Sequence, residues 1–278
     1  MLVHLSGRNL PGVNAQEFLG LVGTHNPTRW YLPVLPSLCA GGQFLFGGCG
    51  LGAAILAMQK TTSRPIVWAT AQYLAYAKPG EVMDVDVIVP AAGHHTTQAR
   101  VVAHVGDREI LTVNAALGSR PFEGRGQWEA MPLVPPVSEC PARAERWPDT
   151  ESILDRLEMR VAVGRQWEDL PGSPGDGFSA LWVRMPGLDM DAIGLAVLGD
   201  YVPYGISQAL GMWVRSNSLD NTLRVVRLVP TEWVLLDIRV QAVDHGFGHG
   251  LVHLWAEDGT LLATASQSAI VRSPLPEG

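Results

Sequence analysis

The sequence predicts an α+β protein that contains two copies of one unit, each a central helix followed by an antiparallel sheet. Three observations support this prediction. Residues 44–59 combine a glycine-rich start with the apolar spacing of a buried helix. The segments that follow alternate apolar and polar residues as strands do, with tight turns between them. A shift of 153 residues then places the strands and turns of the first half on those of the second.

The helix predicted within residues 44–59 has one buried face, because its apolar side chains recur at i, i+3, i+4 and i+7. These side chains are Leu51, Ala54, Ile55 and Met58. A competing interpretation is a dinucleotide-binding turn, since Gly48, Gly50 and Ala53 fit the loose form G-x-G-x-x-A. That turn needs an acidic residue about 20 positions on for the ribose, and the next one, Glu81, lies too far along the chain. We therefore favour a helix that a sheet wraps.

Strand patterns follow this helix in the order of an antiparallel meander. β-branched and aromatic residues mark the first strand, strict alternation marks the second, and glycine turns separate the rest. The expected strands of the first half are residues 65–77, 82–89, 96–105 and 109–117. In the second half, residues 200–214 occupy the place of the central helix, and Pro203 suits its first turn. Residues 218–228 then stand where residues 65–77 stood.

The shift of 153 residues pairs residues of the same type at corresponding places. It pairs Asp84 with Asp237, Val87 with Val240, Gly93 with Gly246, Ala103 with Ala256 and Gly106 with Gly259. Between the halves, residues 119–150 are rich in proline and lack periodicity, which indicates a linker. We expect residues 1–118 to form the first unit and residues 151–278 to form the second.

Composition narrows the classes of function. A chain of 278 residues with 47% hydrophobic residues is long enough for two globular units. Its net charge of −7 argues against broad binding to nucleic acid, and no run of about 18 apolar residues offers a membrane span. The start lacks the pattern of a signal peptide, and the widely spaced cysteines indicate neither a disulfide framework nor a metal site. A cytoplasmic protein is therefore expected.

Several segments together resemble the type II acyl-CoA thioesterases, a family of double-hotdog proteins. The first half carries FGGCGLGAAILAMQ and then PGEVMDVDVIVPAAGHHTTQARVVAHVGDREILTVNAAL. The second half carries LWVRMP, LGDY, SLDNTLRVVR and ASQSAIVR, which are similar to the family's LWxR, SDY/F, xxDH and QEGxxR motifs. The resemblance covers residues 46–272 and depends on the order and spacing of these motifs. It implies a double hotdog, in which two central helices are each wrapped by an antiparallel sheet and the two sheets are joined.

The resemblance also implies catalytic residues. The family's catalytic aspartate matches Asp200 in LGDY, its serine or threonine matches Ser218 in SLDN, and its glutamine matches Gln267 in ASQSA. In the family these three residues hold and polarise a water that attacks the thioester carbonyl, so the implied substrate is a fatty or related acyl-CoA. No metal or redox cofactor is expected. The resemblance further implies a homo-oligomer, a dimer or larger.

The chemistry of thioester hydrolysis suits such residues. A thiolate leaves readily, so the protein has mainly to position water and to stabilise the tetrahedral oxyanion. Asp200 can take a proton from the water, while the hydroxyl of Ser218 and the amide of Gln267 can orient it. Backbone N–H groups at the start of a central helix can stabilise the oxyanion, because they have no partner inside the helix.

Each of these residues also has a purely structural interpretation. Asp200 before a helix can be only an N-cap, and Ser218 can be a hydroxyl at a strand edge. Gln267 lies among alanines on an apolar strand, where a buried amide needs partners. The shift of 153 residues places Asn114 at the position of Gln267, and Cys49 lies near the place of the acid in the first half. We therefore expect one working site, in the second half.

Departures from the family keep other functions open. The family's residues differ from this chain at Cys49, at Asn221 and at residues 68–71. A double-hotdog protein that binds acyl-CoA or an acyl carrier without hydrolysis is therefore one alternative. A hotdog dehydratase is a less favoured one, since such enzymes use a histidine with an acid and residues 94–95 are both histidine. A nucleophile elbow at Ser207 is disfavoured, because its last glycine is missing and no strand leads into it.

Overall fold

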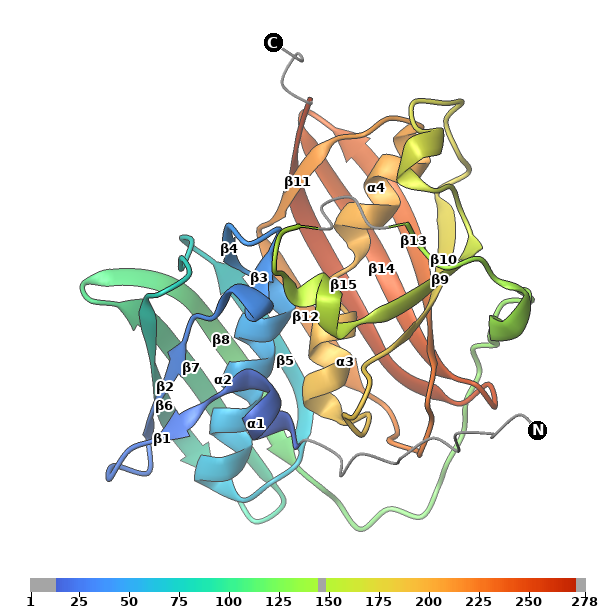
Figure 1. The fold of residues 1–278 in the computed structure, drawn as a ribbon. Helices are drawn as coiled ribbons and strands as arrows, with labels where there is room; N and C mark the ends of the chain where they lie inside the picture. Colours follow the sequence, from blue (N-terminus) through green and yellow to red (C-terminus); the bar gives the residue numbers. More distant parts are fainter. Residues whose placement is uncertain (1–13, 145–148, 274–278) are drawn as a thin grey trace, which may run out of the picture.

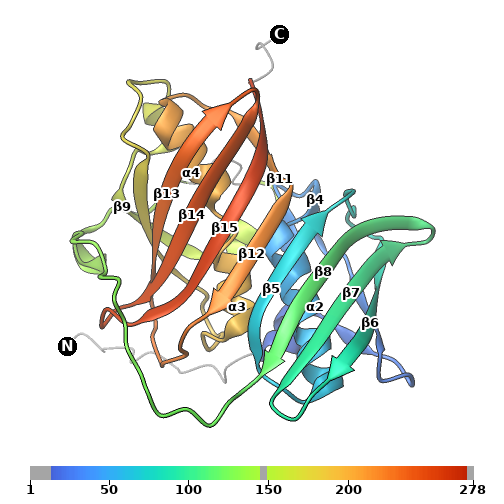
Figure 2. The same cartoon turned by 180° about the vertical axis from the view of Figure 1, so that it is seen from behind.

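The computed structural model describes residues 14–144 and 149–273. Within them, one continuous sheet has 13 strands and a second sheet has two. The helices α2 (Gly47–Thr62), α3 (Ala192–Leu198) and α4 (Val202–Leu210) lie on one side of the large sheet (Figure 1). The view from behind shows the strands of the opposite side uncovered by these helices (Figure 2). This architecture confirms the predicted α+β class and the double hotdog.

The first half begins with a short helix, α1 (Ala15–Leu19), which Asn14 caps by accepting from the N–H of Glu17. Its strands are β1 (Val22–Gly23), β2 (Arg29–Pro33), β3 (Cys39–Ala40), β4 (Phe44–Leu45), β5 (Ile66–Tyr73), β6 (Val82–Ala92), β7 (Thr96–Val105) and β8 (Arg108–Gly118). None of the helices that the structure describes is long and apolar enough to span a membrane.

The second half continues the same sheet. Its strands are β9 (Glu158–Val163), β10 (Phe178–Arg184), β11 (Arg215–Ser218), β12 (Asp220–Val225), β13 (Val234–Asp244), β14 (Phe247–Ala256) and β15 (Leu261–Arg272). The order across the sheet is β1-β2-β6-β7-β8-β5-β12-β15-β14-β13-β10-β9, and β11 pairs with β15. The two halves therefore meet where β5 pairs with β12, and there Ala69 lies opposite Leu223, both buried.

The helix α2 is the buried centre of the first half, as the pattern in residues 44–59 predicts. Residues 48–58 are all buried. A Cβ at Gly48 would lie 2.8 Å from the carbonyl oxygens of Ala196 and Val197 on α3, closer than a carbon atom can approach. Glycine at this place therefore allows the two central helices to pack backbone against backbone.

The helix predicted within residues 200–214 is α4, with Pro203 in its first turn as expected, but α4 is shorter than predicted and another helix, α3, precedes it. The helical centre of the second half therefore consists of two helices, α3 and α4, with a break at residues 199–201. Asp191 caps α3 by accepting two backbone N–H groups. Pro203, the second residue of α4, has no N–H with which a helix could continue from α3, so a new helix begins there. Gly211, with a φ of 64°, ends α4 and leads into β11. Periodicity could not reveal α3, since its sequence AIGLAVL is apolar on every side.

The shift of 153 residues fails on the strand that carries Gln267. Asn114 on β8 is exposed on the side away from α2, whereas Gln267 on β15 is buried on the helix side. The hairpins that precede the two positions are irregular: the pairing register shifts between Ala103 and His104 in the first half and between Leu254 and Trp255 in the second. A slip of one residue turns a side chain to the other face of a sheet. The interpretation of Asn114 as the counterpart of Gln267 is therefore wrong.

The described part of the proline-rich segment, residues 119–144, packs against the outer face of the second half. There Trp182, Trp233 and Trp255 form a small second core with Cys140. Trp182 donates its indole N–H to the carbonyl oxygen of Pro135 at 3.0 Å. Alternate residues on these strands face the central helices, so the sheet is covered on both sides where its strands contribute to this second core.

Candidate active site

Asp200 lies in the break between α3 and α4, with only 6% of its surface exposed. Its Oδ2 accepts from the backbone N–H of Gly48 at 2.7 Å. Its Oδ1 accepts from the hydroxyl of Ser218 at 3.1 Å and from the side-chain amide of Gln267. Three segments that are far apart in sequence therefore hold one buried carboxylate.

The structure brings together all three residues that the sequence singles out. Ser218 is the last residue of β11, and Gln267 is on the helix side of β15, 3% exposed. Gln267 Nε2 donates to Ser218 Oγ at 3.0 Å as well as to Asp200. Gln267 Oε1 accepts from the N–H of Val202, the first residue of α4, at 3.0 Å. The amide thus links the carboxylate, the hydroxyl and the helix start in one network.

The N-cap interpretation of Asp200 is wrong. Tyr201 is the N-cap of α4 and makes no side-chain capping bond. The N–H of Val202 is taken by Gln267 instead, and the oxygens of Asp200 point to Gly48, Ser218 and Gln267. A carboxylate that does not cap the helix following it and that faces a hydroxyl and an amide is placed to accept a proton.

Burial determines the acidity of this carboxylate. Removal from water raises the pKa of Asp200 to about 6, while its hydrogen bonds from Gln267, Gly48 and Ser218 pull the pKa back. A carboxylate with this pKa changes charge close to neutral pH. It is therefore better matched to taking a proton from water than an exposed aspartate is.

The start of α2 belongs to the same site, although the sequence places it in the other half. Gly48 donates to Asp200, and a Cβ at Gly47 would lie 2.6 Å from Asp200 Oδ2 and 2.9 Å from the ring of Tyr73. Only glycine fits at residue 47 without moving one of them. The sequence alone does not reveal this role of the two glycines, because Asp200 lies about 150 residues further along the chain, 152 from Gly48.

Cys49 does not form a second site. It is fully buried in the first turn of α2, and burial raises the pKa of its thiol well above the usual range. The neighbouring Gly48 is already part of the site around Asp200. The site expected in the second half alone therefore includes a residue of the first half.

The other sequence candidates lie outside this network. Ser207 is inside α4, where its hydroxyl accepts from the N–H of Val214, so it is an ordinary helix residue. His94 and His95 are at the turn between β6 and β7 and contact each other. Among the described residues, no cluster of three or more His, Cys, Asp or Glu side chains is placed to hold a metal ion.

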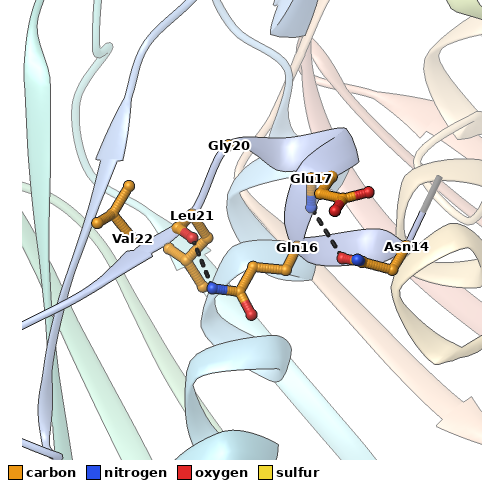
Figure 3. Close-up of a pocket in the computed structure, with 6 residues that line it drawn as sticks. All are labelled: Asn14, Gln16, Glu17, Gly20, Leu21 and Val22. Atoms are coloured by element: carbon orange, nitrogen blue, oxygen red, sulfur yellow. Dashed lines mark hydrogen bonds between the residues drawn. The ribbon is translucent and has the colours of Figure 1, made fainter.

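A shallow surface hollow lies beside α1 and β1 (Figure 3). Asn14 caps α1, and Gln16 donates to the carbonyl oxygen of Leu21 at 3.1 Å. These polar side chains therefore serve the local fold. The hollow contains none of the residues around Asp200.

Two helical centres wrapped by one antiparallel sheet, with a buried polar network between them, define a double-hotdog protein. Solved structures of other proteins have the same fold. A hotdog-fold protein of Alicyclobacillus acidocaldarius is 18% identical over 94% of this chain and 98% of its own, with a TM-score of 0.82. An acyl-CoA thioesterase II, TesB2, of Mycobacterium marinum is 19% identical over 94% and 98%, with a TM-score of 0.73.

A more similar sequence and a family model define the family. A candidate thioesterase of Novosphingobium aromaticivorans is 32% identical over 91% of this chain and 98% of its own, with a TM-score of 0.81. The model of the acyl-CoA thioesterase C-terminal domain matches residues 135–271. The search of curated proteins found no match. The chain belongs to the type II acyl-CoA thioesterase family.

Proposed function

We propose that this protein is an acyl-CoA thioesterase, which hydrolyses a fatty or related acyl-CoA to the free acid and CoA. The observation that carries the proposal is the buried network of Asp200, Ser218 and Gln267 at the start of two central helices. A carboxylate, a hydroxyl and an amide that share one point can hold a water by accepting and donating hydrogen bonds. The pKa of Asp200, about 6, supports its role as the base.

In the proposed reaction, Asp200 takes a proton from water while the water oxygen bonds to the thioester carbon. Ser218 and Gln267 orient the water, and the carbonyl becomes a tetrahedral oxyanion. The C–S bond then breaks, the carbonyl forms again, and the CoA thiolate receives the proton from Asp200. The positive end of the α2 dipole, where Gly48 donates to Asp200, lies at this site and favours the negative charge of the oxyanion.

The test is release of free thiol from a panel of saturated, branched and aromatic acyl-CoA esters. Asp200→Asn and Gln267→Ala are expected to lower kcat by about 10²- to 10⁴-fold, the usual contribution of a general base and its positioning groups. Asp244→Asn, which changes an exposed carboxylate outside the network, is the matched control and is expected to keep kcat.

Three outcomes would contradict parts of the proposal. Binding of the esters without thiol release would support the non-hydrolytic binding protein instead. Formation of a double bond without thiol release would support a dehydratase. Full turnover in both Asp200→Asn and Gln267→Ala would leave the enzyme class standing but refute the assignment of the site.

Assembly and location remain predictions, the first from the family resemblance and the second from composition. A homo-oligomer, dimer or larger, is expected to elute from size exclusion with a light-scattering mass at least twice the 30.0 kDa of one chain. A cytoplasmic location is expected to place the protein in the soluble fraction of fractionated cells of its source. A monomeric mass would contradict the first prediction.

A further inference from the structure

Three buried polar atoms next to Asp200 lack hydrogen-bond partners within the described structure. They are the hydroxyl oxygen of Tyr73 and both side-chain amide atoms of Asn221. Asn221 is 0% exposed. Leaving a polar group buried and unpaired costs about 1–3 kcal/mol, so such atoms are rare and call for a functional reason. The network of Asp200, Ser218 and Gln267 does not use them.

The sheet places these two side chains side by side. Asn221 on β12 pairs with Ala71 on β5, and Tyr73 follows two residues later on the same face of β5. The backbone N–H of Tyr73 donates to Leu219 at 2.9 Å, which holds the ends of the two strands together. Alternate residues of a strand share a face. Tyr73 and Asn221 therefore face the central helices across the junction of the two halves.

The hydroxyl of Tyr73 faces the same small volume as the base. A Cβ at Gly47 would be 3.0 Å from the Tyr73 hydroxyl and 2.6 Å from Asp200 Oδ2, so both oxygens border the start of α2. Burial, followed by the charge of Asp200, raises the pKa of Tyr73 well above its usual value. The phenol therefore keeps its proton at neutral pH and remains a hydrogen-bond donor.

We propose that Tyr73 is a further catalytic residue, whose hydroxyl donates a hydrogen bond to the thioester carbonyl oxygen and to the oxyanion formed from it, and that Asn221 positions this hydroxyl. The inference extends the proposed thioester hydrolysis and rests on it. No bond to Tyr73 forms or breaks. Its proton stays on the phenol and stabilises the charge that develops on the carbonyl oxygen.

The role of Asn221 follows from the hydrogen-bonding capacity of its amide. The amide lies beside the Tyr73 hydroxyl. Its NH₂ group can donate to the phenolic oxygen, which leaves the phenolic proton free for the substrate. The amide thus orients Tyr73 without touching the reacting atoms.

The first test compares Tyr73→Phe with Tyr204→Phe. Tyr204 on α4 also has a buried hydroxyl without a hydrogen-bond partner among the described residues, but it lies under Arg143. Tyr73→Phe is expected to lower kcat about 10²-fold, the cost of losing one oxyanion donor, with KM changed less than about threefold. Tyr204→Phe is expected to keep kcat within about twofold.

Thermal unfolding separates catalysis from structure. Tyr73→Phe keeps the buried ring and loses only the contact of its hydroxyl with the Asn221 amide, which costs about 1–3 kcal/mol at most, so the variant is expected to stay folded at the assay temperature. A kcat equal to that of the unchanged protein overturns the proposal. A loss of kcat that comes with loss of the cooperative unfolding transition at the assay temperature overturns it as well.

The positioning role of Asn221 is tested by a double-mutant cycle. Asn221→Ala is expected to lower kcat at least about tenfold in the unchanged protein but less than about twofold in Tyr73→Phe, because the group it positions is then absent. Equal effects in both backgrounds would overturn the assignment of Asn221. The assignment of Tyr73 is judged from Tyr73→Phe alone.

A binding measurement tests Tyr73 independently of turnover. Two unreactive analogues of acyl-CoA are compared by calorimetry: a ketone, in which a CH₂ replaces the sulfur, and a thioether, which lacks the carbonyl. Tyr73→Phe is expected to raise the Kd of the ketone about threefold to tenfold, which corresponds to the loss of one neutral hydrogen bond. The Kd of the thioether is expected to stay unchanged. Equal effects on both analogues, or binding of neither, would overturn the inference. If no ester releases thiol but the ketone still discriminates, only the proposed hydrolysis fails.

Discussion

At the scale of single residues, Asp200 combines two properties that usually exclude each other. It is almost fully buried, and it can still carry charge near neutral pH because Gly48, Ser218 and Gln267 donate to it. Burial alone favours the protonated acid, whereas donors favour the carboxylate. The balance leaves its pKa at about 6. Activity that depends on this carboxylate therefore depends on pH in the physiological range.

The pH dependence of hydrolysis follows from this balance. A base works only when deprotonated, so kcat/KM is expected to fall about tenfold per pH unit below about 6 and to level off above it. The measurement is kcat/KM for one acyl-CoA ester between pH 5 and 8, after subtraction of hydrolysis without enzyme. The exposed-site variant Asp244→Asn should give the same curve. A flat profile across this range would argue against Asp200 as the base.

At the scale of elements, the site depends on how three helix ends meet. The break between α3 and α4 turns the side chain of Asp200 towards the start of α2. The lack of a side chain at Gly48 lets the backbones of α2 and α3 pack in direct contact. A helix that ran without a break from α3 into α4 would use this stretch for helical hydrogen bonds. The break therefore places the carboxylate where its partners are.

Gly47 tests this arrangement. A Cβ there would lie 2.6 Å from Asp200 Oδ2 and 2.9 Å from the Tyr73 ring, so Gly47→Ala must displace one of them. We expect kcat to fall at least about tenfold and unfolding stability to fall by about 1–3 kcal/mol, as for overpacking of a core. Gly80→Ala is the control. Gly80 has a φ of 86° but open space around it, so that variant should lose stability and keep kcat. Full activity in Gly47→Ala would contradict the crowding at this site.

At the scale of the whole molecule, the two halves together build the candidate site. The strands β5 and β12 join their sheets, α2 packs on α3, and the donor to Asp200 comes from the first half. Leu223, which is buried at the junction opposite Ala69, lies next to the break at Gly199. Neither half contains the complete site.

Unfolding is therefore expected to be cooperative across the junction. Calorimetry should give one transition, with a calorimetric enthalpy close to the van't Hoff enthalpy for the cooperative unit. Leu223→Ala opens a cavity at the junction and should lower the free energy of unfolding by about 2–5 kcal/mol. The single transition should shift to lower temperature without splitting. Two separate transitions in the unchanged protein would contradict this view.

Local patterns predicted most of the regular elements. The strands expected at 82–89, 96–105 and 109–117 agree with β6, β7 and β8 to within a few residues, because alternation and glycine turns are local signals. The helix α3 was missed, since a helix buried on all sides has no amphipathic period. Asn114 was misassigned because a fixed shift cannot account for an irregular hairpin.

For the site, the sequence by itself determined Asp200, Ser218 and Gln267 as residues to consider, through their resemblance to family motifs. Tertiary structure alone decided that these three share hydrogen bonds, that Gly48 joins them from the other half, and that Tyr73 lies beside them. The physical reason is distance along the chain. Periodicity and turn chemistry act over a few residues, whereas the contact between Asp200 and Gly48 spans 152 and exists only once two helices and one sheet have packed.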